Sequence, residues 1–254
     1  MVPRPESKWI RIALYCVIAF GLSYLARVHW HTNGLSDPKQ GVGAMYWHLA
    51  GAIGPFLGAL AVWTVFRPER PITFAGSSPA IALAMLALPA VVLGAMGMDN
   101  SFSLEPHLFG VHMGLLIVAY ALLEETGWRG YLQSEFRDRP PLLRYGIVGL
   151  FWYAWHFSYL GSTSLSAELF NALILILAAV GIGFVADRTR SIFAAAAFHA
   201  AGNIMFLSAD FKAMIPSAGT RASIVAVCIV GWLAMMRLWR VQETRRAALS
   251  HPNA

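Results

Sequence analysis

Long apolar stretches alternate with short polar ones along most of the chain. A run of about 20 apolar residues is long enough for a helix to cross the hydrocarbon core of a bilayer. We find eight such runs, and each predicts a membrane-spanning helix. The runs are residues 9–28, 44–66, 80–98, 109–136, 142–160, 167–186, 191–207 and 222–239. The pattern therefore predicts an all-α, polytopic membrane helical bundle with about eight transmembrane helices.

The amino-acid composition indicates the same environment. Hydrophobic residues make up 57% of the chain and charged residues only 13%, whereas a soluble domain normally carries about 25% charged residues. So few charges cannot cover the water-facing surface of a protein of this length. The net charge of +6 comes with arginines in short clusters between the apolar runs, not in a continuous basic stripe. We therefore expect a lipid bilayer as a partner and no nucleic acid.

Lysine and arginine residues indicate the orientation, because cytoplasmic loops of membrane proteins carry an excess of both. If the N-terminus is cytoplasmic, 15 of these 19 residues lie on the cytoplasmic side. The other four are Arg27, Lys39, Lys212 and Arg221. This bias predicts that the N- and C-termini are both cytoplasmic. Because no Ser/Gly/Pro-rich linker divides the chain, we expect residues 1–254 to form a single membrane domain. That domain would be integral and multi-pass, in the cell membrane if the source is bacterial.

Three charged residues interrupt the fourth apolar run. They are Glu124, Glu125 and Arg129. A charged side chain at the centre of a membrane helix costs about 2.5–3.5 kcal/mol, so the three together would cost roughly 8–10 kcal/mol in lipid. The large aliphatic residues nearby stabilise the inserted helix by only about 2–4 kcal/mol. These charges must therefore face protein or a water-filled cavity.

Polar residues in two later runs lie at a similar predicted depth. A helix rises 1.5 Å per residue, which places Glu124 about 18 Å from the cytoplasmic end of the run 109–136. His156 lies about 20 Å from the start of its run, and Asn203 about 18 Å from the start of its own. Glu125 and Arg129 are four residues apart, as are His199 and Asn203, and residues at this spacing share a helix face. The spacing predicts one polar cluster built from three helices.

At these residues the sequence resembles the CPBP family, which includes CAAX endoproteases of the Ras-converting type and bacteriocin-processing and abortive-infection relatives. Its E-E-x-x-x-R motif matches Glu124, Glu125 and Arg129. Its F-x-x-x-H motif ends at His156, with Trp152 in the aromatic position, and its H-x-x-x-N motif is formed by His199 and Asn203. The resemblance predicts a CPBP-type peptidase core over residues 108–207.

The resemblance implies hydrolysis of a peptide bond inside the membrane, in a membrane-associated peptide or protein substrate. Carried over by position, Glu124 would be the general base and would act with His156. His199 and Asn203 would stabilise the oxyanion, and Glu125 and Arg129 would be supporting residues. The aromatic residues Trp152 and Trp155 are candidates for lining a substrate groove.

The family has also been described as metal-dependent, and three of the same residues would suit a metal. Glu124, His156 and His199 would form a His₂Glu set with an open fourth position, as in catalytic zinc sites. No H-E-x-x-H motif is present, however, and the three residues belong to three different apolar runs. We favour catalysis by glutamate without a metal, and the sequence leaves zinc open.

Two other classes of protein compete with the peptidase. A non-catalytic immunity or scaffold protein could use the same fold, but it would have no reason to bury Glu124, His156, His199 and Asn203 together. A transporter would also bury charges, yet it predicts inverted repeats and paired broken helices, and neither is visible in the sequence. The sequence therefore favours the intramembrane endopeptidase.

Overall fold

The computed structural model describes residues 5–33, 42–160, 164–207, 215 and 217–250. Nearly all of this part is helical, and the predicted all-α class is confirmed. In chain order the elements are α1 (Pro5–Asn33), α2 (Val42–Phe66), α3 (Pro79–Met96), α4 (Pro106–Glu125), the π-helix η2 (Thr126–Leu132), α5 (Gln133–Glu135), α6 (Pro141–Leu160), α7 (Leu165–Thr189), α8 (Ile192–Gly202), the π-helix η3 (Asn203–Leu207) and α10 (Ala218–Ser250). The only β-type pairing in the described residues is an isolated parallel bridge between Thr73 and Ser191.

Six helical segments are long and apolar enough to cross a membrane, by length and composition. They are residues 8–28, 46–66, 79–96, 106–135, 165–189 and 218–246. The two other predicted spans are also helical: α6, and α8 with η3, of which Ile192–Met205 forms a shorter apolar helix. A polytopic helical bundle is therefore confirmed. The number of crossings and the cytoplasmic location of the termini stay predictions.

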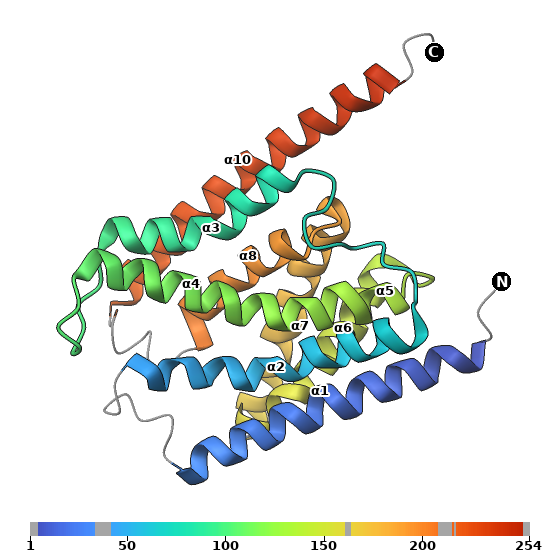
Figure 1. The fold of residues 1–254 in the computed structure, drawn as a ribbon, viewed down its shortest axis with the longest axis horizontal. Helices are drawn as coiled ribbons and strands as arrows, with labels where there is room; N and C mark the ends of the chain where they lie inside the picture. The colour runs from blue at the N-terminus through green and yellow to red at the C-terminus, as the bar shows by residue number, and fades with distance from the viewer. Residues whose placement is uncertain (1–4, 34–41, 161–163, 208–214, 216, 251–254) are drawn as a thin grey trace.

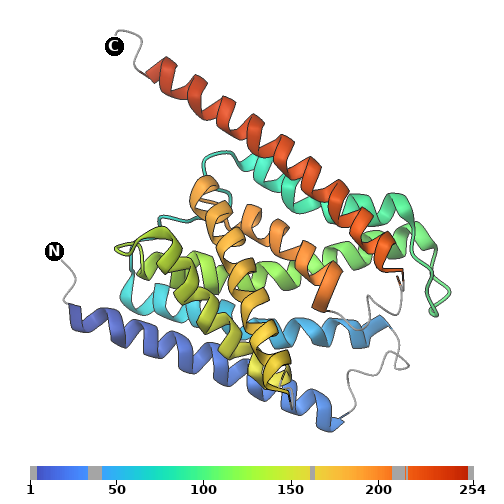
Figure 2. The same cartoon turned by 180° about the vertical axis from the view of Figure 1, so that it is seen from behind.

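The bundle is arranged around α4 and α8 (Figure 1). On one side α1 pairs with α2, and on the other α3 packs against both α4 and α10. From behind, α6 and α7 cover the centre (Figure 2). The start of α1 and the end of α10 lie toward the same end of the bundle in both views. Lys39 and Lys212, which were expected at the opposite end, fall outside the described residues.

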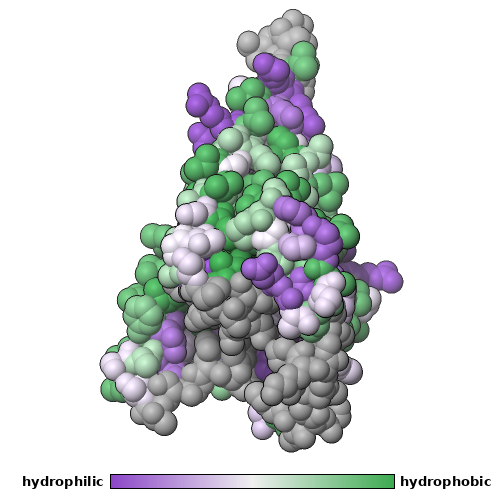
Figure 3. All heavy atoms as spheres, turned by 90° about the vertical axis from the view of Figure 1, so that its left-hand side faces the viewer, coloured by the Kyte–Doolittle hydropathy of each residue, from purple (hydrophilic) through white to green (hydrophobic). Residues whose placement is uncertain are grey.

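The outer surface carries many large hydrophobic side chains. Leu165, Leu142 and Val17 are exposed by 76%, 72% and 72%. Figure 3 shows hydrophobic residues over much of the bundle, while hydrophilic residues gather near the end of α10. Exposed apolar areas of this extent mark membrane or protein contact surfaces. Together with the six apolar helices, they make this an integral membrane protein.

The central helix α8 can be buried because its residues are small. Ala194, Ala195, Ala196 and Ala197 are all fully buried, and α8 contacts α3, α4 and α7. Its N-terminus is fixed by a loop, since the Ile192 backbone N–H donates to the Thr73 carbonyl at 2.9 Å. These contacts hold the polar end of α8 at the centre of the bundle.

A close approach also fixes η2 against the first two helices. A Cβ atom on Gly127 would lie 2.5 Å from the Tyr15 hydroxyl oxygen and 2.6 Å from the Pro55 carbonyl oxygen. Real Cβ atoms do not come this close to a backbone oxygen. Glycine at position 127 therefore allows the residues after Glu125 to pack directly on α1 and α2.

Ion pairs and hydrogen bonds join the helices at the end of the bundle where α1 begins. Arg11 donates to both carboxylate oxygens of Glu135, at 2.9 and 2.8 Å. Asp187 accepts from Gln133 at 2.8 Å, from Tyr145 at 2.5 Å and from Arg144. Through these contacts α5 is held to α1, α6 and α7. We call the Asp187 and Glu135 carboxylates with their donors the anchoring cluster.

Candidate active site

The two glutamates at the end of α4 are buried. Glu124 is 1% exposed and Glu125 is 0% exposed. Arg129 Nη1 donates to Glu125 Oε1 at 2.6 Å, so the pairing predicted from the four-residue spacing is confirmed. The same oxygen lies 2.8 Å from His199 Nδ1. An ionised carboxylate can only accept, so the Nδ1 atom carries the proton in this contact.

Trp152 of α6 links Glu124 to His156. Its indole Nε1 donates to Glu124 Oε2 at 2.7 Å. Its backbone carbonyl lies 2.7 Å from His156 Nδ1. Because a carbonyl oxygen can only accept, His156 donates to it through Nδ1. Trp152, the aromatic residue of the F-x-x-x-H motif, therefore orients both the Glu124 carboxylate and the His156 imidazole.

The polar residues of α8 and η3 complete the cluster. His199 is 2% exposed and Asn203 is 6% exposed. The ring of Trp152 lies 5.0 Å from that of His199 and 5.3 Å from that of His156, centroid to centroid, and Arg129 Cζ lies 4.8 Å from the Trp152 ring centroid. The structure thus gathers the predicted residues around Trp152, and we call Glu124, Glu125, Arg129, His156, His199 and Asn203 the buried cluster.

Five atoms of the buried cluster have no hydrogen-bond partner in the described part of the chain. They are Glu125 Oε2, Arg129 Nε, Arg129 Nη2, His199 Nε2 and Asn203 Oδ1. A buried polar atom without a partner is costly and is uncommon in folded proteins. These atoms are therefore available to water molecules or a substrate.

Both π-helices adjoin this cluster. The first begins at Thr126, directly after Glu125, and the second begins at Asn203. We predicted one long helix over residues 109–136. The chain is helical up to Glu135, but it changes helix type in between. Isolated π turns are rare and occur frequently at functional sites. No pattern in the sequence indicated them.

Arg27 is a charged residue near this site that was not among the predicted site residues. The count of positive charges assigned it to the side opposite the termini, and the structure shows that it is buried, with 5% of its surface exposed. It donates to the Trp155 carbonyl at 3.1 Å and to the Gly51 carbonyl at 3.4 Å. It also interacts electrostatically with Glu124 and His156. The position of an arginine inside an apolar run was the signal that could have found it.

The two tryptophans proposed for a groove are both in the interior. Trp152 and Trp155 are each 1% exposed. The Trp155 ring lies 3.8 Å from Arg27 Cζ, and its Nε1 donates to the Ala19 carbonyl at 3.3 Å. Both residues therefore shape the wall behind the buried cluster. Their contact with a substrate stays a prediction.

The predicted zinc ligands do not form a metal set in this arrangement. Within the described residues, no three His, Cys, Asp or Glu side chains are grouped so that they could hold a metal ion. The three side chains Glu124, His156 and His199 therefore do not fit a zinc ion in the arrangement that the structure shows.

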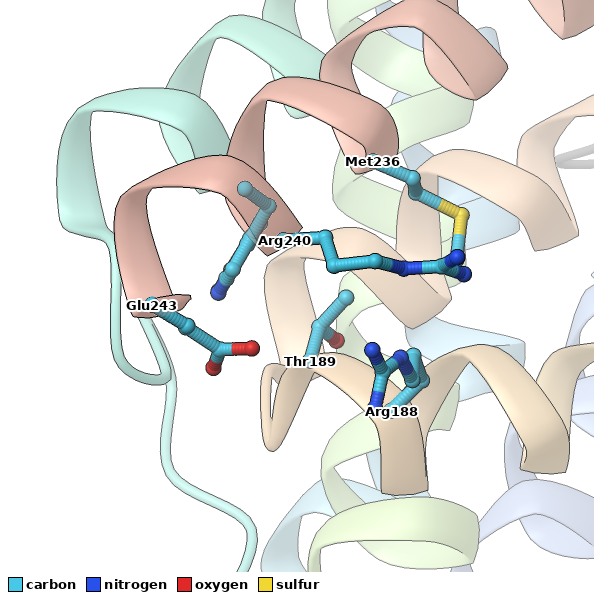
Figure 4. A pocket seen from close by; sticks show the side chains of 6 residues that line it. Arg188, Thr189, Met236, Arg240 and Glu243 are labelled. Atoms are coloured by element: carbon cyan, nitrogen blue, oxygen red, sulfur yellow. The ribbon is translucent and has the colours of Figure 1, made fainter. Parts of the chain in front are cut away.

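A small pocket lies away from the buried cluster, between the end of α7 and α10 (Figure 4). It is lined by Arg188, Thr189, Met236, Trp239, Arg240 and Glu243. None of the predicted site residues is among them. Glu243 is held by the Ser77 hydroxyl at 2.6 Å, so this pocket belongs to the packing of the long C-terminal helix.

Comparison with known proteins concerns the segment that carries the buried cluster. Residues 106–205 match the family described as type II CAAX prenyl endopeptidase Rce1-like. This range contains every residue from Glu124 to Asn203 discussed above. This segment, which is less than half of the chain, is similar to the CPBP family. Helices α1–α3 and α10 lie outside the matched segment, and so does Arg27.

A curated relative matches over a similar length. The chain is 31% identical over 107 residues to "CAAX prenyl protease 2" of Methanococcus maripaludis. The alignment covers 37% of this chain and 40% of the relative. The chain therefore aligns with less than half of the curated relative's length.

Proposed function

We propose that this protein is an intramembrane endopeptidase of the CPBP family that hydrolyses a peptide bond of a membrane-associated peptide or protein. The observation that carries the proposal is the buried carboxylate of Glu124 in a cluster that leaves polar atoms without partners, among them His199 Nε2 and Asn203 Oδ1. Burying a carboxylate and leaving buried polar atoms unpaired is costly. A peptidase needs a base beside an oxyanion site, and that need accounts for this cost.

In the proposed reaction Glu124 and His156 take a proton from a water molecule while its oxygen bonds to the carbonyl carbon of the substrate. The carbonyl π electrons move to the oxygen, and the resulting oxyanion accepts from the Asn203 amide nitrogen and from His199 Nε2, which donates when both ring nitrogens of His199 carry a proton. Fixed donors of this kind are among the largest contributions to catalysis, because they need no reorganisation. The C–N bond then breaks, and the proton passes to the leaving nitrogen.

The remaining residues of the cluster have supporting roles. Glu125 binds the His199 imidazole and the Arg129 guanidinium through one oxygen, and so fixes the direction in which His199 points. Trp152 fixes Glu124 and His156 in the same way. Because the three acidic and imidazole groups do not form a metal set, no step of the mechanism uses a metal.

The printed name of the relative supports the substrate class. "CAAX prenyl protease 2" indicates C-terminal C-a-a-X tails, in which the cysteine carries a prenyl chain. A prenyl chain would hold such a tail at the bilayer beside the helices. We extend the proposal to one membrane domain with both termini cytoplasmic, in the cell membrane if the source is bacterial. Trp152 and Trp155 would lie behind the bound peptide.

A processing assay tests the assignment. The purified chain in liposomes is given a farnesylated peptide ending in Cys-Val-Ile-Met, and Glu124→Ala, His156→Ala and His199→Ala are compared with the wild type. We expect each variant to lose about 10²–10⁴-fold in kcat, the usual contribution of a general acid or base. Glu69→Ala, in an exposed loop, is the control and should keep full activity. Full activity in the Glu124 variant contradicts the assignment, and loss of wild-type activity on chelation contradicts the metal-free mechanism.

A further inference from the structure

The pocket between α7 and α10 lies where the apolar parts of both helices end. Arg188 and Thr189 are the last two residues of α7. Arg240 and Glu243 lie close to Arg246, at which the apolar segment of α10 ends. The space between these side chains is about 220 Å³ and includes open solvent. Because the ends of apolar segments lie at the boundary of the hydrocarbon core, the pocket faces the layer of lipid headgroups.

The two arginines of the pocket carry positive charge that no ion pair neutralises. Neither the Arg188 nor the Arg240 side chain makes an ion pair or a hydrogen bond in the part of the chain that the structure describes. Figure 4 shows Arg188 at the end of α7 and Arg240 on α10. Among the described lining residues only Glu243 is acidic, and it accepts from the Ser77 hydroxyl at 2.6 Å. Two guanidinium groups and one carboxylate leave the pocket with an excess of positive charge.

This charge suits a phosphate group. The N–H donors of a guanidinium lie in one plane and match the oxygen atoms of a phosphate, and arginine is therefore the usual residue in phosphate sites. Basic pockets between membrane helices on the cytoplasmic side bind the headgroups of anionic lipids. The excess of lysine and arginine predicts that this end of the bundle is cytoplasmic.

Exposed apolar side chains continue from the two arginines toward the middle of the bilayer. Phe184 precedes Arg188 by four residues and Leu233 precedes Arg240 by seven, so each lies on the same helix face as its arginine. Both side chains are more than half exposed. A free phosphate ion would contact the arginines alone, whereas a phospholipid would also place its acyl chains along Phe184 and Leu233. The arrangement therefore favours a phospholipid.

From this arrangement we infer that the pocket binds the phosphate group of an anionic phospholipid in the leaflet at that end of the bundle. Arg188 and Arg240 hold the phosphate oxygens from two different helices, so the lipid connects the end of α7 to α10. A zwitterionic headgroup carries its own cation next to the phosphate, and that cation competes with the arginines. The pocket therefore prefers a headgroup with a net negative charge. This site lies apart from the buried cluster and does not depend on the proposed peptidase activity.

Titration with short-chain lipids tests the inference. The purified wild-type chain in detergent micelles is titrated with dioctanoyl phosphatidylglycerol, dioctanoyl phosphatidylcholine and inorganic phosphate, and the dissociation constants are measured by isothermal titration calorimetry. An arginine at the membrane surface raises the affinity for an anionic lipid about fivefold, so two arginines raise it about 25-fold. We expect phosphatidylglycerol to bind about 25-fold more tightly than phosphatidylcholine. The double variant Arg188→Gln/Arg240→Gln should lose this preference.

The matched control is the double variant Arg190→Gln/Arg245→Gln, which removes the same charge from the end of α7 and from α10. Both residues are exposed and neither lines the pocket, so the preference should stay within about twofold of the wild type because salt screens exposed charges. An equal loss in both double variants would overturn the inference, because the whole basic surface would then attract the lipid. Equal binding of the two lipids by the wild type, which needs no variant to fold, would also overturn it. Inorganic phosphate that binds as tightly as phosphatidylglycerol would indicate a site for the free ion and exclude the lipid site.

Discussion

The buried cluster and the anchoring cluster share one continuous helical segment, yet they differ in how completely their carboxylates are bonded. In the anchoring cluster both oxygens of Glu135 accept from Arg11, and both oxygens of Asp187 accept from neighbouring helices; among its donors, Gln133 Oε1 and Arg144 Nε have no partner in the described residues. In the buried cluster Glu125 Oε2 has no partner in the described residues, and neither do Arg129 Nε, Arg129 Nη2, His199 Nε2 and Asn203 Oδ1. A satisfied network stabilises the fold, whereas an incomplete one costs stability. The fully bonded carboxylates suit the anchoring cluster to holding the bundle together, and the larger number of unpaired atoms suits the buried cluster to binding.

The largest expected effect comes from removing Glu125. In Glu125→Ala the Arg129 guanidinium loses its carboxylate and His199 loses the partner of Nδ1. Breaking a buried ion pair by removing one partner costs about 3–5 kcal/mol. We expect the free energy of unfolding to fall by this amount, measured by circular dichroism in mixed micelles. Activity should fall as well. A change below about 1 kcal/mol would mean that the pair is not desolvated.

The second largest effect is expected when Glu124 keeps its charge but loses the hydrogen bond that orients it. Trp152→Phe keeps an aromatic ring but removes the Nε1 donor. Because Glu124 then loses the bond that orients it, we expect about 10- to 100-fold lower kcat, measured by peptide processing. Trp232→Phe is the control, since Trp232 is equally buried but donates to the Met85 carbonyl instead. A similar loss of activity in both variants would show that only packing is involved.

A substitution in the anchoring cluster should lower the free energy of unfolding and leave kcat unchanged. Asp187→Ala leaves three donors on α5 and α6 without an acceptor, and each such loss costs about 1–3 kcal/mol when the group is buried. Because Asp187 is 28% exposed, water can replace part of these bonds, and we expect about 1–2 kcal/mol in total. The kcat of the folded fraction should not change. A fall in kcat larger than the fall in folded protein would place Asp187 in the catalytic site.

The smallest effect lies at the exposed edge of the same region. Lys8 donates to Asp138 and holds the pKa of that carboxyl below its usual value. A lowered pKa contributes stability above the unfolded-state pKa and loses it as the pH falls through the folded one. The two side chains are 23% and 56% exposed, so Asp138→Asn should change the free energy of unfolding by less than about 0.5 kcal/mol near pH 7. The difference from wild type should disappear as the pH falls through the lowered pKa of Asp138, and a difference that stays constant with pH would contradict the ion-pair origin.

The sequence predicted the elements well because helix formation in a membrane depends on local composition. All eight apolar runs are helical, and the pairing of Glu125 with Arg129 followed from their spacing. The contact between Glu125 and His199 joins residues 74 positions apart. The spacing of residues along the sequence does not predict which atoms of two different helices are in contact. The burial of Arg27 near the site was not predicted for a related reason, since packing decides whether a charge near the end of an apolar run is buried or exposed.

The π-helix between Glu125 and Gln133 has a consequence for how this helix tolerates change. Each of its i→i+5 hydrogen bonds encloses one residue more than an α-helical bond does, and one residue corresponds to about 100° of rotation. The π-helix thus sets the rotation about the helix axis between the pair Glu124 and Glu125 and the later residue Gln133. Gln133 donates to Asp187 of α7. Deleting one residue here would leave the span long and apolar enough for the bilayer. It would nevertheless rotate the residues after the deletion away from the helices that they contact. The number of residues in this segment therefore has to be kept.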